Sequence, residues 1–379
     1  MKLTFVVGTS RSGSTMLSRI LHKHPDVLCV SEFFGTLMRV MHERVFPIAD
    51  LDGRELWRML TTPFHFFDAA IRDGLRFPEL CYPYGSGRFD PVTAPSEPGS
   101  RSEPGTGVPM ISHITLPMIT DDPDGLYDQL AAEIPRWPAR PAASQYRALF
   151  ALLADLLERR IVVERSSTSL SVVPLLRQQF PEARFVHMHR DGPDCALSLS
   201  GHPLFRMAGL RAAAVRAAGL SSWDEIEAEL RRLYQLKQLP PEFNGLIVWP
   251  FDAQRFMAYP IPVAFFGQMW SRMVCEGVPA LSELPPEAWT GLRYEDLLRD
   301  SEAELTRLAG FLGVPASSRW LAAARQLIDS RGNGSGGAAA AQPGQQQLDA
   351  LREACAPGTR AIADADARRS APAAAHSVS

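Results

Sequence analysis

Apolar and polar positions near the start of the chain predict a strand, a polar loop, a helix and a second strand. Residues 3–7, LTFVV, are a short run of β-branched and aromatic side chains, which predicts a strand. From Ser14 onward apolar residues recur at helical spacing, and Pro25 predicts that this helix ends near residue 24. Residues 27–30, VLCV, predict the second strand.

A second unit of the same kind follows between residues 160 and 200. The runs RIVVE and RFVHMH predict two strands, and each precedes a segment with helical spacing, at 169–180 and 193–200. Strands that alternate with helices predict an α/β fold with a parallel sheet flanked by helices on both faces. In such sheets ligands bind beyond the carboxyl ends of the strands. The candidate loops therefore follow Val7, Val30, Glu164 and His189.

The rest of the chain divides by composition. We expect mainly helical segments at 36–80, 121–158 and 205–290, and a flexible insertion at 83–109, which is dense in Pro, Gly and Ser. After residue 330 the sequence is rich in Gly, Ala, Gln and Pro and has no aromatic residue. We therefore predict a single domain over 1–330, followed by a low-complexity, disordered tail over 331–379 with one short helix near 345–355.

Composition excludes several classes of protein. The chain has 379 residues, 46% of them hydrophobic, and a net charge of −3, so it can bury a large core but is not a general binder of nucleic acid. No run approaches the roughly 18–20 apolar residues of a membrane-spanning helix. Five scattered cysteines without a C-x-x-C pair predict neither a disulfide framework nor a zinc site. We expect a soluble, cytoplasmic enzyme, and the Ala- and Arg-rich composition favours a GC-rich bacterial source.

The loop after the first strand carries the clearest chemical signal. It has the G-x-x-x-x-G spacing of a phosphate-binding loop, in which backbone N–H groups and the start of the following helix form an anion site. The loop departs from the nucleotide-hydrolase pattern because Ser14 stands where that pattern has Lys, and Arg11 supplies the cation from within the loop. Such a loop suits a single phosphate better than a magnesium-bound triphosphate. The predicted ligand-binding residues are Gly8, Thr9, Ser10, Arg11, Ser12, Gly13, Ser14 and Thr15.

Three segments resemble the sulfotransferases that use 3′-phosphoadenosine-5′-phosphosulfate (PAPS). In that family a loop of the type [PS]-[KR]-S-G-[ST]-T binds the 5′-phosphosulfate, and this chain has S-R-S-G-S-T at 10–15. A second family motif binds the 3′-phosphate through an Arg and a Ser eight residues later, and here Arg190 and Ser198 match it. The segment 292–315 resembles the family's "RYEDL…FLG" stretch, which we expect to be mainly structural. The resemblance implies a P-loop-like sulfotransferase fold with PAPS as co-substrate and no metal.

The resemblance also implies catalytic residues. In the protein-tyrosine sulfotransferases a similar loop, an "HPD" stretch and a strand lead to a catalytic Glu, and Glu32 occupies that place here. Arg165 stands where those enzymes have a Lys that reaches the transferring group. With Arg11 it is expected to stabilise charge on the transferring sulfonate and the leaving bisphosphate. A histidine base, as in the cytosolic phenol and steroid enzymes, stays open, and His113 is then the candidate.

The sequence therefore predicts a sulfotransferase that moves the sulfonate group of PAPS to a hydroxyl group. We expect a small-molecule acceptor rather than a protein, whereas the acceptor's identity and the oligomeric state stay open. The alternatives are a P-loop ATP-dependent small-molecule kinase and a non-catalytic nucleotide-binding protein. The missing loop Lys counts against the kinase. The late motif that closes the nucleotide site in many eukaryotic enzymes is also absent, apart from Arg331 and its Gly-rich neighbours.

Overall fold

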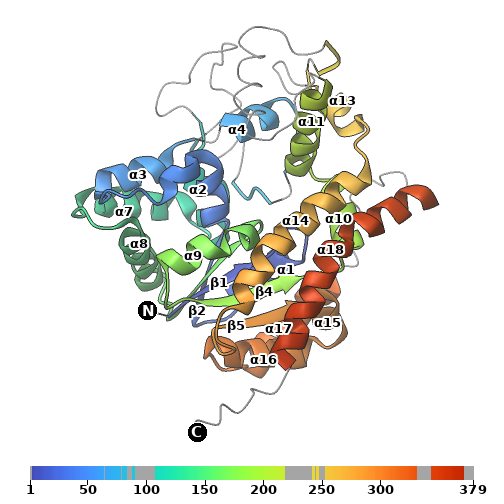
Figure 1. Cartoon of the computed structure of the whole chain (residues 1–379). Helices are drawn as coiled ribbons and strands as arrows, with labels where there is room; N and C mark the ends of the chain where they lie inside the picture. The colour runs from blue at the N-terminus through green and yellow to red at the C-terminus, as the bar shows by residue number, and fades with distance from the viewer. Residues whose placement is uncertain are drawn as a thin grey trace.

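A five-stranded parallel sheet forms the centre of the protein (Figure 1). The strands are β1 (Lys2–Val7), β2 (Val27–Ser31), β3 (Ile161–Ser166), β4 (Arg184–His189) and β5 (Trp289–Arg293). Their order is β2-β3-β1-β4-β5, and every neighbouring pair is parallel. The predicted α/β class is thus confirmed, and four of the five strands lie where the apolar runs predict them. The computed structural model describes residues 2–63, 65–77, 79–82, 88–89, 107–217, 241–243, 245–246, 252–330 and 343–370.

The register brings the predicted loops to one edge of the sheet. Val7 pairs with Ser166 and with His187 on the two sides of β1, and Ser31 pairs with Arg165. The chain therefore leaves β1, β2, β3 and β4 at the same edge, as expected for parallel strands joined by crossovers. Residues far apart in sequence meet there, which is what a binding site at this edge requires.

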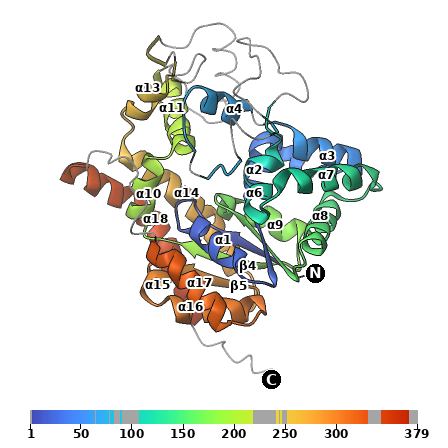
Figure 2. The same ribbon diagram turned by 180° about the vertical axis from the view of Figure 1, so that it is seen from behind.

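Helices cover both faces of the sheet (Figures 1 and 2). Side chains alternate along β1, so Phe5 and Val7 face one apolar core and Val6 faces another. The core behind Val6 is closed by α1 (Ser14–His22), α15 (Tyr294–Arg299), α16 (Ser301–Leu312) and α17 (Ser318–Asp329). The core at Phe5 is closed by α2 (Phe33–Met41), α8 (Ala142–Leu156), α9 (Val173–Gln179), α10 (Gly192–Ser200), α14 (Val263–Ser282) and α18 (Gln345–Ser370).

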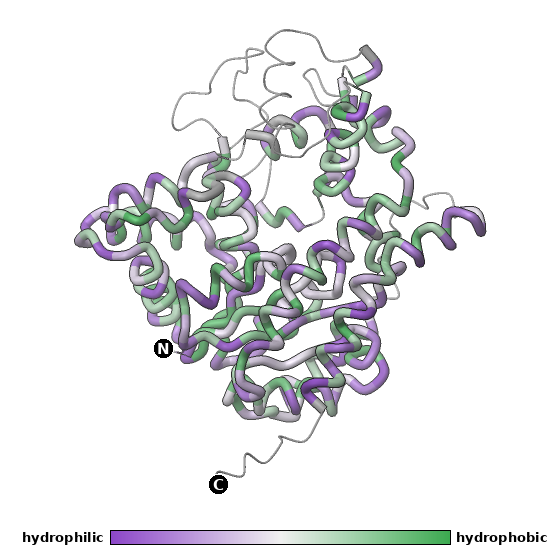
Figure 3. The backbone as a smooth tube through the Cα atoms, in the orientation of Figure 1, coloured by the Kyte–Doolittle hydropathy of each residue, from purple (hydrophilic) through white to green (hydrophobic). Residues whose placement is uncertain are grey.

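Further helices extend the molecule beyond the sheet. Beside α2 lie α3 (Gly53–Thr61), α5 (Met110–His113), α6 (Thr115–Ile119) and α7 (Pro123–Glu133). A third apolar cluster joins α4 (His65–Arg72), α11 (Pro203–Ala217) and α13 (Ala253–Ala258), at the top of Figure 1. Hydrophilic and hydrophobic positions alternate along the outer helices in Figure 3, as in helices with one buried face. The predicted insertion at 83–109 and residue 331 lie largely or wholly outside the described residues.

The helix predicted near residues 345–355 is present and longer than expected, which corrects the prediction of disorder for residues 343–370; residues 331–342 and 371–379 lie outside the described residues. Residues 345–370 form one long helix, α18, which packs along α14, and Leu351, Cys355 and Ala365 are buried. The missing side chain of Gly267 leaves room on α14, since a Cβ there would lie 2.9 Å from Leu351 and 3.2 Å from the Cys355 sulfur. A composition with few apolar residues forms a docked helix because the facing helix is complementary in shape.

Pro357 lies within α18 and interrupts its backbone hydrogen bonds. A side chain of α14 forms hydrogen bonds with the backbone groups of the interrupted turn. The Ser271 hydroxyl donates to the Ala354 carbonyl at 2.7 Å and accepts the Gly358 N–H at 3.1 Å. The hydroxyl is therefore inserted between a donor and an acceptor four residues apart, which in an unbroken helix would bond to each other. This tertiary contact cannot be read from local composition.

Candidate functional site

The loop between β1 and α1 is held in an unusual backbone conformation. Ser10 and Arg11 both have positive φ, 63° and 55°, which side chains other than glycine adopt rarely. The segment that follows β3 holds the loop in place, because the Ser10 N–H donates to the Ser167 carbonyl and the Leu170 N–H donates to the Gly8 carbonyl at 3.2 Å. Strained backbone that the surroundings hold in place is a common property of binding sites.

The start of α1 is open for an anion. Gly13 is the N-cap, with φ 92°, and no side chain of the described residues caps the helix. The first N–H groups of α1 therefore have no acceptor within the helix. The hydroxyl of Ser12 is fully buried and has no hydrogen-bond partner among the described residues. Both predicted glycines are needed, since a Cβ on Gly13 would overlap the Tyr294 ring and a Cβ on Gly8 would lie 2.8 Å from the Met188 carbonyl. The loop is thus shaped to bind a phosphate or sulfate group.

Helix α10 supports the loop from the side opposite β3. The Arg11 Nε donates to the Ser198 hydroxyl at 2.9 Å, which brings together two residues predicted for different phosphate groups. The Cys195 thiol donates to the Ser10 carbonyl at 3.0 Å and lies 3.5 Å from the Thr9 hydroxyl. Burial raises the pKa of Cys195 to about 11, so this cysteine is a buried thiol that holds the loop and not a reactive thiolate.

Arg190 leaves β4 beside the loop. Its guanidinium lies over the Tyr294 ring, 5.0 Å from the ring centroid, and forms an ion pair with Asp194 at 3.3 Å. The Arg190 Nε is buried and has no hydrogen-bond partner among the described residues. The Asp191 N–H donates to the Glu295 carboxylate at 3.0 Å. The segment Tyr294–Glu295 therefore positions the arginine predicted to bind the 3′-phosphate.

Glu32 and Arg165 meet at the carboxyl ends of β2 and β3. They are 3% and 2% exposed, and the Arg165 Nη1 donates to the Glu32 Oε1. The same oxygen accepts the Ser167 N–H at 3.1 Å, whereas Glu32 Oε2 and Arg165 Nε have no hydrogen-bond partner among the described residues. The Ser167 carbonyl in turn accepts the Ser10 N–H of the loop. The predicted base, the predicted cation and the loop therefore form one connected group.

The alternative base, His113, lies in different surroundings. Its ring has no exposed surface, packs on Phe67 with 5.5 Å between the ring centroids, and lies 3.9 Å from Asp68. Burial lowers the pKa of His113 to about 3 and raises that of Asp68 to about 7. A histidine so weakly basic and so enclosed is poorly suited to accept a proton from an acceptor hydroxyl.

The structure adds residues to the candidate site that the sequence analysis missed. Tyr294 and Glu295 belong to the segment expected to be structural, yet they contact Gly13, Arg190 and Asp191. Another addition is Arg39 of α2, whose Nη2 lies 3.5 Å from the Thr168 hydroxyl. Burial lowers the pKa of Arg39, and the nearby Glu32 partly offsets this effect. The sequence did not predict that Arg39 is buried near the candidate site, because a charged residue on a helix is ordinarily exposed to solvent.

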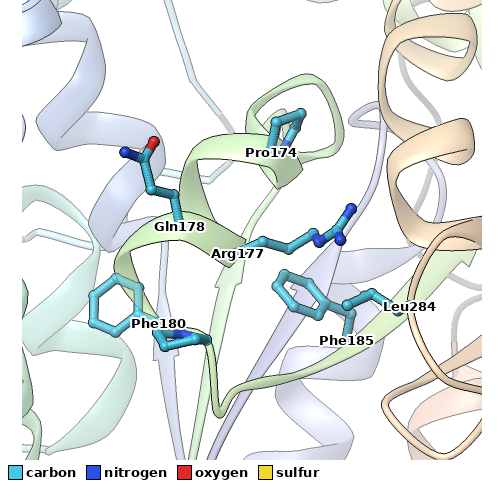
Figure 4. Close-up of a pocket in the computed structure, with 7 residues that line it drawn as sticks. Pro174, Arg177, Gln178, Phe180, Phe185 and Leu284 are labelled. Carbon is cyan, nitrogen blue, oxygen red and sulfur yellow. The ribbon is translucent and has the colours of Figure 1, made fainter.

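A hollow of about 390 Å³ lies elsewhere (Figure 4). Pro174, Arg177, Phe180, Phe185 and Leu284 line it, and Phe185 stands near the amino end of β4. The loop after β1 lies at the opposite edge of the sheet, so this hollow is separate from the candidate site. Arg177 is engaged there with the Ala280 carbonyl and with Glu283.

Metal binding and membrane spanning are two further properties on which the described residues bear. No group of three or more His, Cys, Asp or Glu side chains in this part of the chain is arranged to hold a metal ion. Within the same residues, no helix combines the length and the apolar character needed to span a bilayer.

The comparison with protein families matches the N-terminal part of the chain. The model of the sulfotransferase family matches residues 4–73, which include β1, the loop, α1, β2, Glu32 and α2. The chain therefore resembles sulfotransferases over this part, as predicted, and the match supports an enzyme of sulfonate transfer. A comparison with curated protein sequences gives no match.

Solved structures similar to this protein include three bacterial-type sulfotransferases. The sulfotransferase domain of the curacin biosynthetic pathway is 16% identical, with a TM-score of 0.38, over 84% of this chain and 77% of that one. The sulfotransferase domain of the Synechococcus PCC 7002 olefin synthase is 14% identical, with a TM-score of 0.38, over 94% of each chain. Sulfotransferase STF9 from Mycobacterium avium is 15% identical, with a TM-score of 0.41, over 96% of this chain and 76% of that one.

Proposed function

We propose that this protein transfers the sulfonate group of PAPS to a hydroxyl group of a small-molecule acceptor. The observation that carries the proposal is the connection from the anion-binding loop through Ser167 to the buried Glu32–Arg165 pair. A loop suited to one phosphate or sulfate group beside a carboxylate and a cation has what in-line transfer requires: a site for the transferring group, a base and a charge stabiliser.

The donor is held at two separate anion sites in this proposal. Residues 8–15 and the open start of α1 bind the 5′-phosphosulfate, and one donor is the Ser12 hydroxyl, which has no partner in the described part of the chain. Arg190 binds the 3′-phosphate through its buried Nε, which has no hydrogen-bond partner among the described residues, and the phosphate replaces its ion pair with Asp194. Ser198 reaches the same region and is linked to the loop through Arg11. PAPS carries both groups, whereas ATP carries a single triphosphate.

Glu32 serves as the base. The Arg165 guanidinium and the Ser167 N–H both bind Oε1, and Oε2 is left to accept the proton of the acceptor hydroxyl. As the proton arrives at Glu32, Arg165 loses its anionic partner. Its charge is then available, with that of Arg11, to stabilise the sulfonate oxygens and the leaving 3′,5′-adenosine bisphosphate. No metal ion is needed for these steps.

Thermal unfolding with different nucleotides tests the donor site. We expect 3′,5′-adenosine bisphosphate at about 100 times its dissociation constant to stabilise the protein by about 3 kcal/mol, which raises Tm by a few degrees. ATP with Mg²⁺ should give a smaller shift. Arg190→Ala should abolish the shift with the bisphosphate, and Arg325→Ala, an exposed arginine of α17, should leave it unchanged. A shift with magnesium-ATP alone would refute the proposal and favour a kinase.

Release of the bisphosphate from PAPS tests the chemistry. Glu32→Gln keeps the size of the side chain but removes the base, so we expect turnover to fall by about 10²–10⁴-fold, with affinity for the bisphosphate changed little. Wild-type protein that binds the bisphosphate but never consumes PAPS, in the presence of a panel of alcohols and phenols, would instead favour a non-catalytic nucleotide-binding protein.

A further inference from the structure

Glu32 has a left-handed backbone conformation, which is unusual for a residue other than glycine. Its φ is 55°, in the left-handed region, which residues with a Cβ adopt rarely. Its N–H donates to the Arg165 carbonyl at 2.6 Å, and its carbonyl accepts the Thr36 N–H at 3.0 Å. Glu32 therefore stands at the N-cap of α2 while its carboxylate points toward Arg165.

The first N–H groups of α2 are consequently capped by another strand. An N-cap side chain ordinarily accepts the second or third N–H of its helix, but the Glu32 carboxylate is engaged elsewhere. Instead, the Phe34 N–H donates to Glu164 Oε1 at 3.1 Å, and the Gly35 N–H donates to the Ser166 hydroxyl at 2.7 Å. The Ser166 hydroxyl also donates to Glu164 Oε1, so the two side chains of β3 form one capping unit.

The packing around this unit leaves little freedom for Glu32. A Cβ on Gly35 would lie 2.6 Å from Glu32 Oε2 and 3.3 Å from the Ser166 hydroxyl, so the carboxylate occupies the space that a side chain at position 35 would take. Glu164 and Ser166 have no exposed surface. Because β3 alternates, these two side chains reach α2 and the intervening Arg165 reaches Glu32 from the same strand.

We propose that Glu164 and Ser166 are positioning residues, which cap α2 from β3 and thereby hold Glu32 in the conformation that directs its carboxylate to Arg165. The consequence for turnover rests on the proposed function, because it assumes that Glu32 is the base. The capping itself is independent of that assumption. Glu164 does not act on the substrate in this proposal, since its contacts are with the backbone of α2 and with Ser166.

Four variants separate positioning from general stability. Glu164→Leu removes both oxygens, Ser166→Ala removes one cap in a milder way, and Glu164→Gln keeps an oxygen that can accept the Phe34 N–H. Val162→Ala is the matched control, because this buried residue of the same strand has an apolar side chain that cannot cap a helix. If Glu164→Leu does not fold, the comparison of Ser166→Ala with Val162→Ala carries the test.

The first readout is the carboxyl resonance of Glu32 in protein labelled with ¹³C at the glutamate carboxyl carbon. The resonance is assigned by its loss in Glu32→Gln. We expect it to shift in Glu164→Leu and Ser166→Ala, to stay close to the wild-type position in Glu164→Gln, and not to move in Val162→Ala. An unmoved resonance in both cap-removing variants overturns the proposal, whether or not the protein is a sulfotransferase.

The second readout is a double-mutant cycle on PAPS turnover. We expect Glu164→Leu to lower the rate about 10- to 100-fold, because small displacements of a reacting group have effects of this size. Affinity for the bisphosphate should change less than about twofold, and Glu164→Gln should restore most of the rate. In a Glu32→Gln background, Glu164→Leu should cause no further loss. An equal loss in both backgrounds would show that Glu164 does not act through Glu32, and absence of turnover in wild-type protein would refute the proposed function alone.

Discussion

Replacing Glu164 by Gln is expected to change how the stability of this protein depends on pH. Glu164 is fully buried, its Oε2 has no hydrogen-bond partner among the described residues, and burial raises its pKa to about 8. The nearby Glu32 carboxylate raises this pKa further, whereas the Ser166 and Phe34 hydrogen bonds and Arg165 lower it. At pH 7 the folded protein therefore holds a proton that the unfolded chain, with an ordinary value of 4.5, has released.

The sign and size follow from proton linkage. A carboxyl whose folded-state pKa is raised contributes its full stability below the unfolded value, and this contribution is lost as pH rises from about 4.5 toward 8. One proton of difference changes the free energy of unfolding by about 1.4 kcal/mol per pH unit, which amounts to about 3 kcal/mol between pH 5 and pH 7. Glu164→Gln has no such proton, so its stability relative to wild type should rise by about 3 kcal/mol over this interval.

Urea unfolding of both proteins at pH 5, 6 and 7 measures the effect. Asp68 and His113 also have shifted pKa values, but both proteins contain them, so their contributions cancel in the difference. Val162→Ala, which alters a residue of β3 without a titratable group, should give a difference that does not depend on pH. If the free-energy difference for Glu164→Gln is also flat, Glu164 is ionised in the folded protein and the reasoning is wrong.

Three further predictions concern α18, the loop and the support of Arg190. Leu351→Ala should lower the free energy of unfolding, measured in urea, by about 2–5 kcal/mol, whereas Leu298→Ala, at a half-exposed position, should change it little. A negligible loss for Leu351→Ala would mean that α18 is not docked. Gly13→Ala should abolish the increase in Tm that the bisphosphate causes. Gly74 has a similar φ of 91° but no described atom within 4 Å of an added Cβ, so Gly74→Ala should keep the increase. Equal behaviour of the two variants would contradict the role of the Tyr294 contact. Tyr294→Leu should weaken bisphosphate binding, measured by calorimetry, several-fold, because a cation–π contact contributes about 0.5–2 kcal/mol. Combined with Arg190→Ala, it should cause little further loss of affinity. Independent losses would show that Tyr294 acts elsewhere.

The elements that the sequence predicted well have patterns set by local chemistry. Short β-branched runs produced β1 to β4, and Pro25 marked the end of α1 within two to three residues. β5, residues 289–293, was not predicted, because WTGLR contains a Gly, a Thr and an Arg and has no continuous apolar run. It is a strand because β4 provides a neighbour with which to pair.

The candidate site was predicted in part for a similar reason. The chemical identity of Arg11, Glu32, Arg165, Arg190 and Ser198 was readable from spacing and resemblance. Their pairing was not, because it depends on which strands are neighbours: β3 lies between β1 and β2, so Arg165 meets Glu32 although 133 positions separate them. The same strand order places Glu164 and Ser166 at the start of α2, whereas the sequence of β3 alone shows them only as polar residues at the end of a strand.

The amino-acid sequence by itself determined the α/β class, the candidate phosphate-binding loop and most of the residues with charge at the candidate site, because these depend on periodicity and residue type over short distances. Only the tertiary structure decided that residues 345–370 form a docked helix, that Tyr294 supports Arg190, and that Glu164 is a buried cap for α2. Each of these depends on the shape and the unpaired hydrogen-bonding groups of a segment distant in sequence. A buried carboxyl and an Ala-rich helix become favourable only where another segment provides the complementary donors and surface.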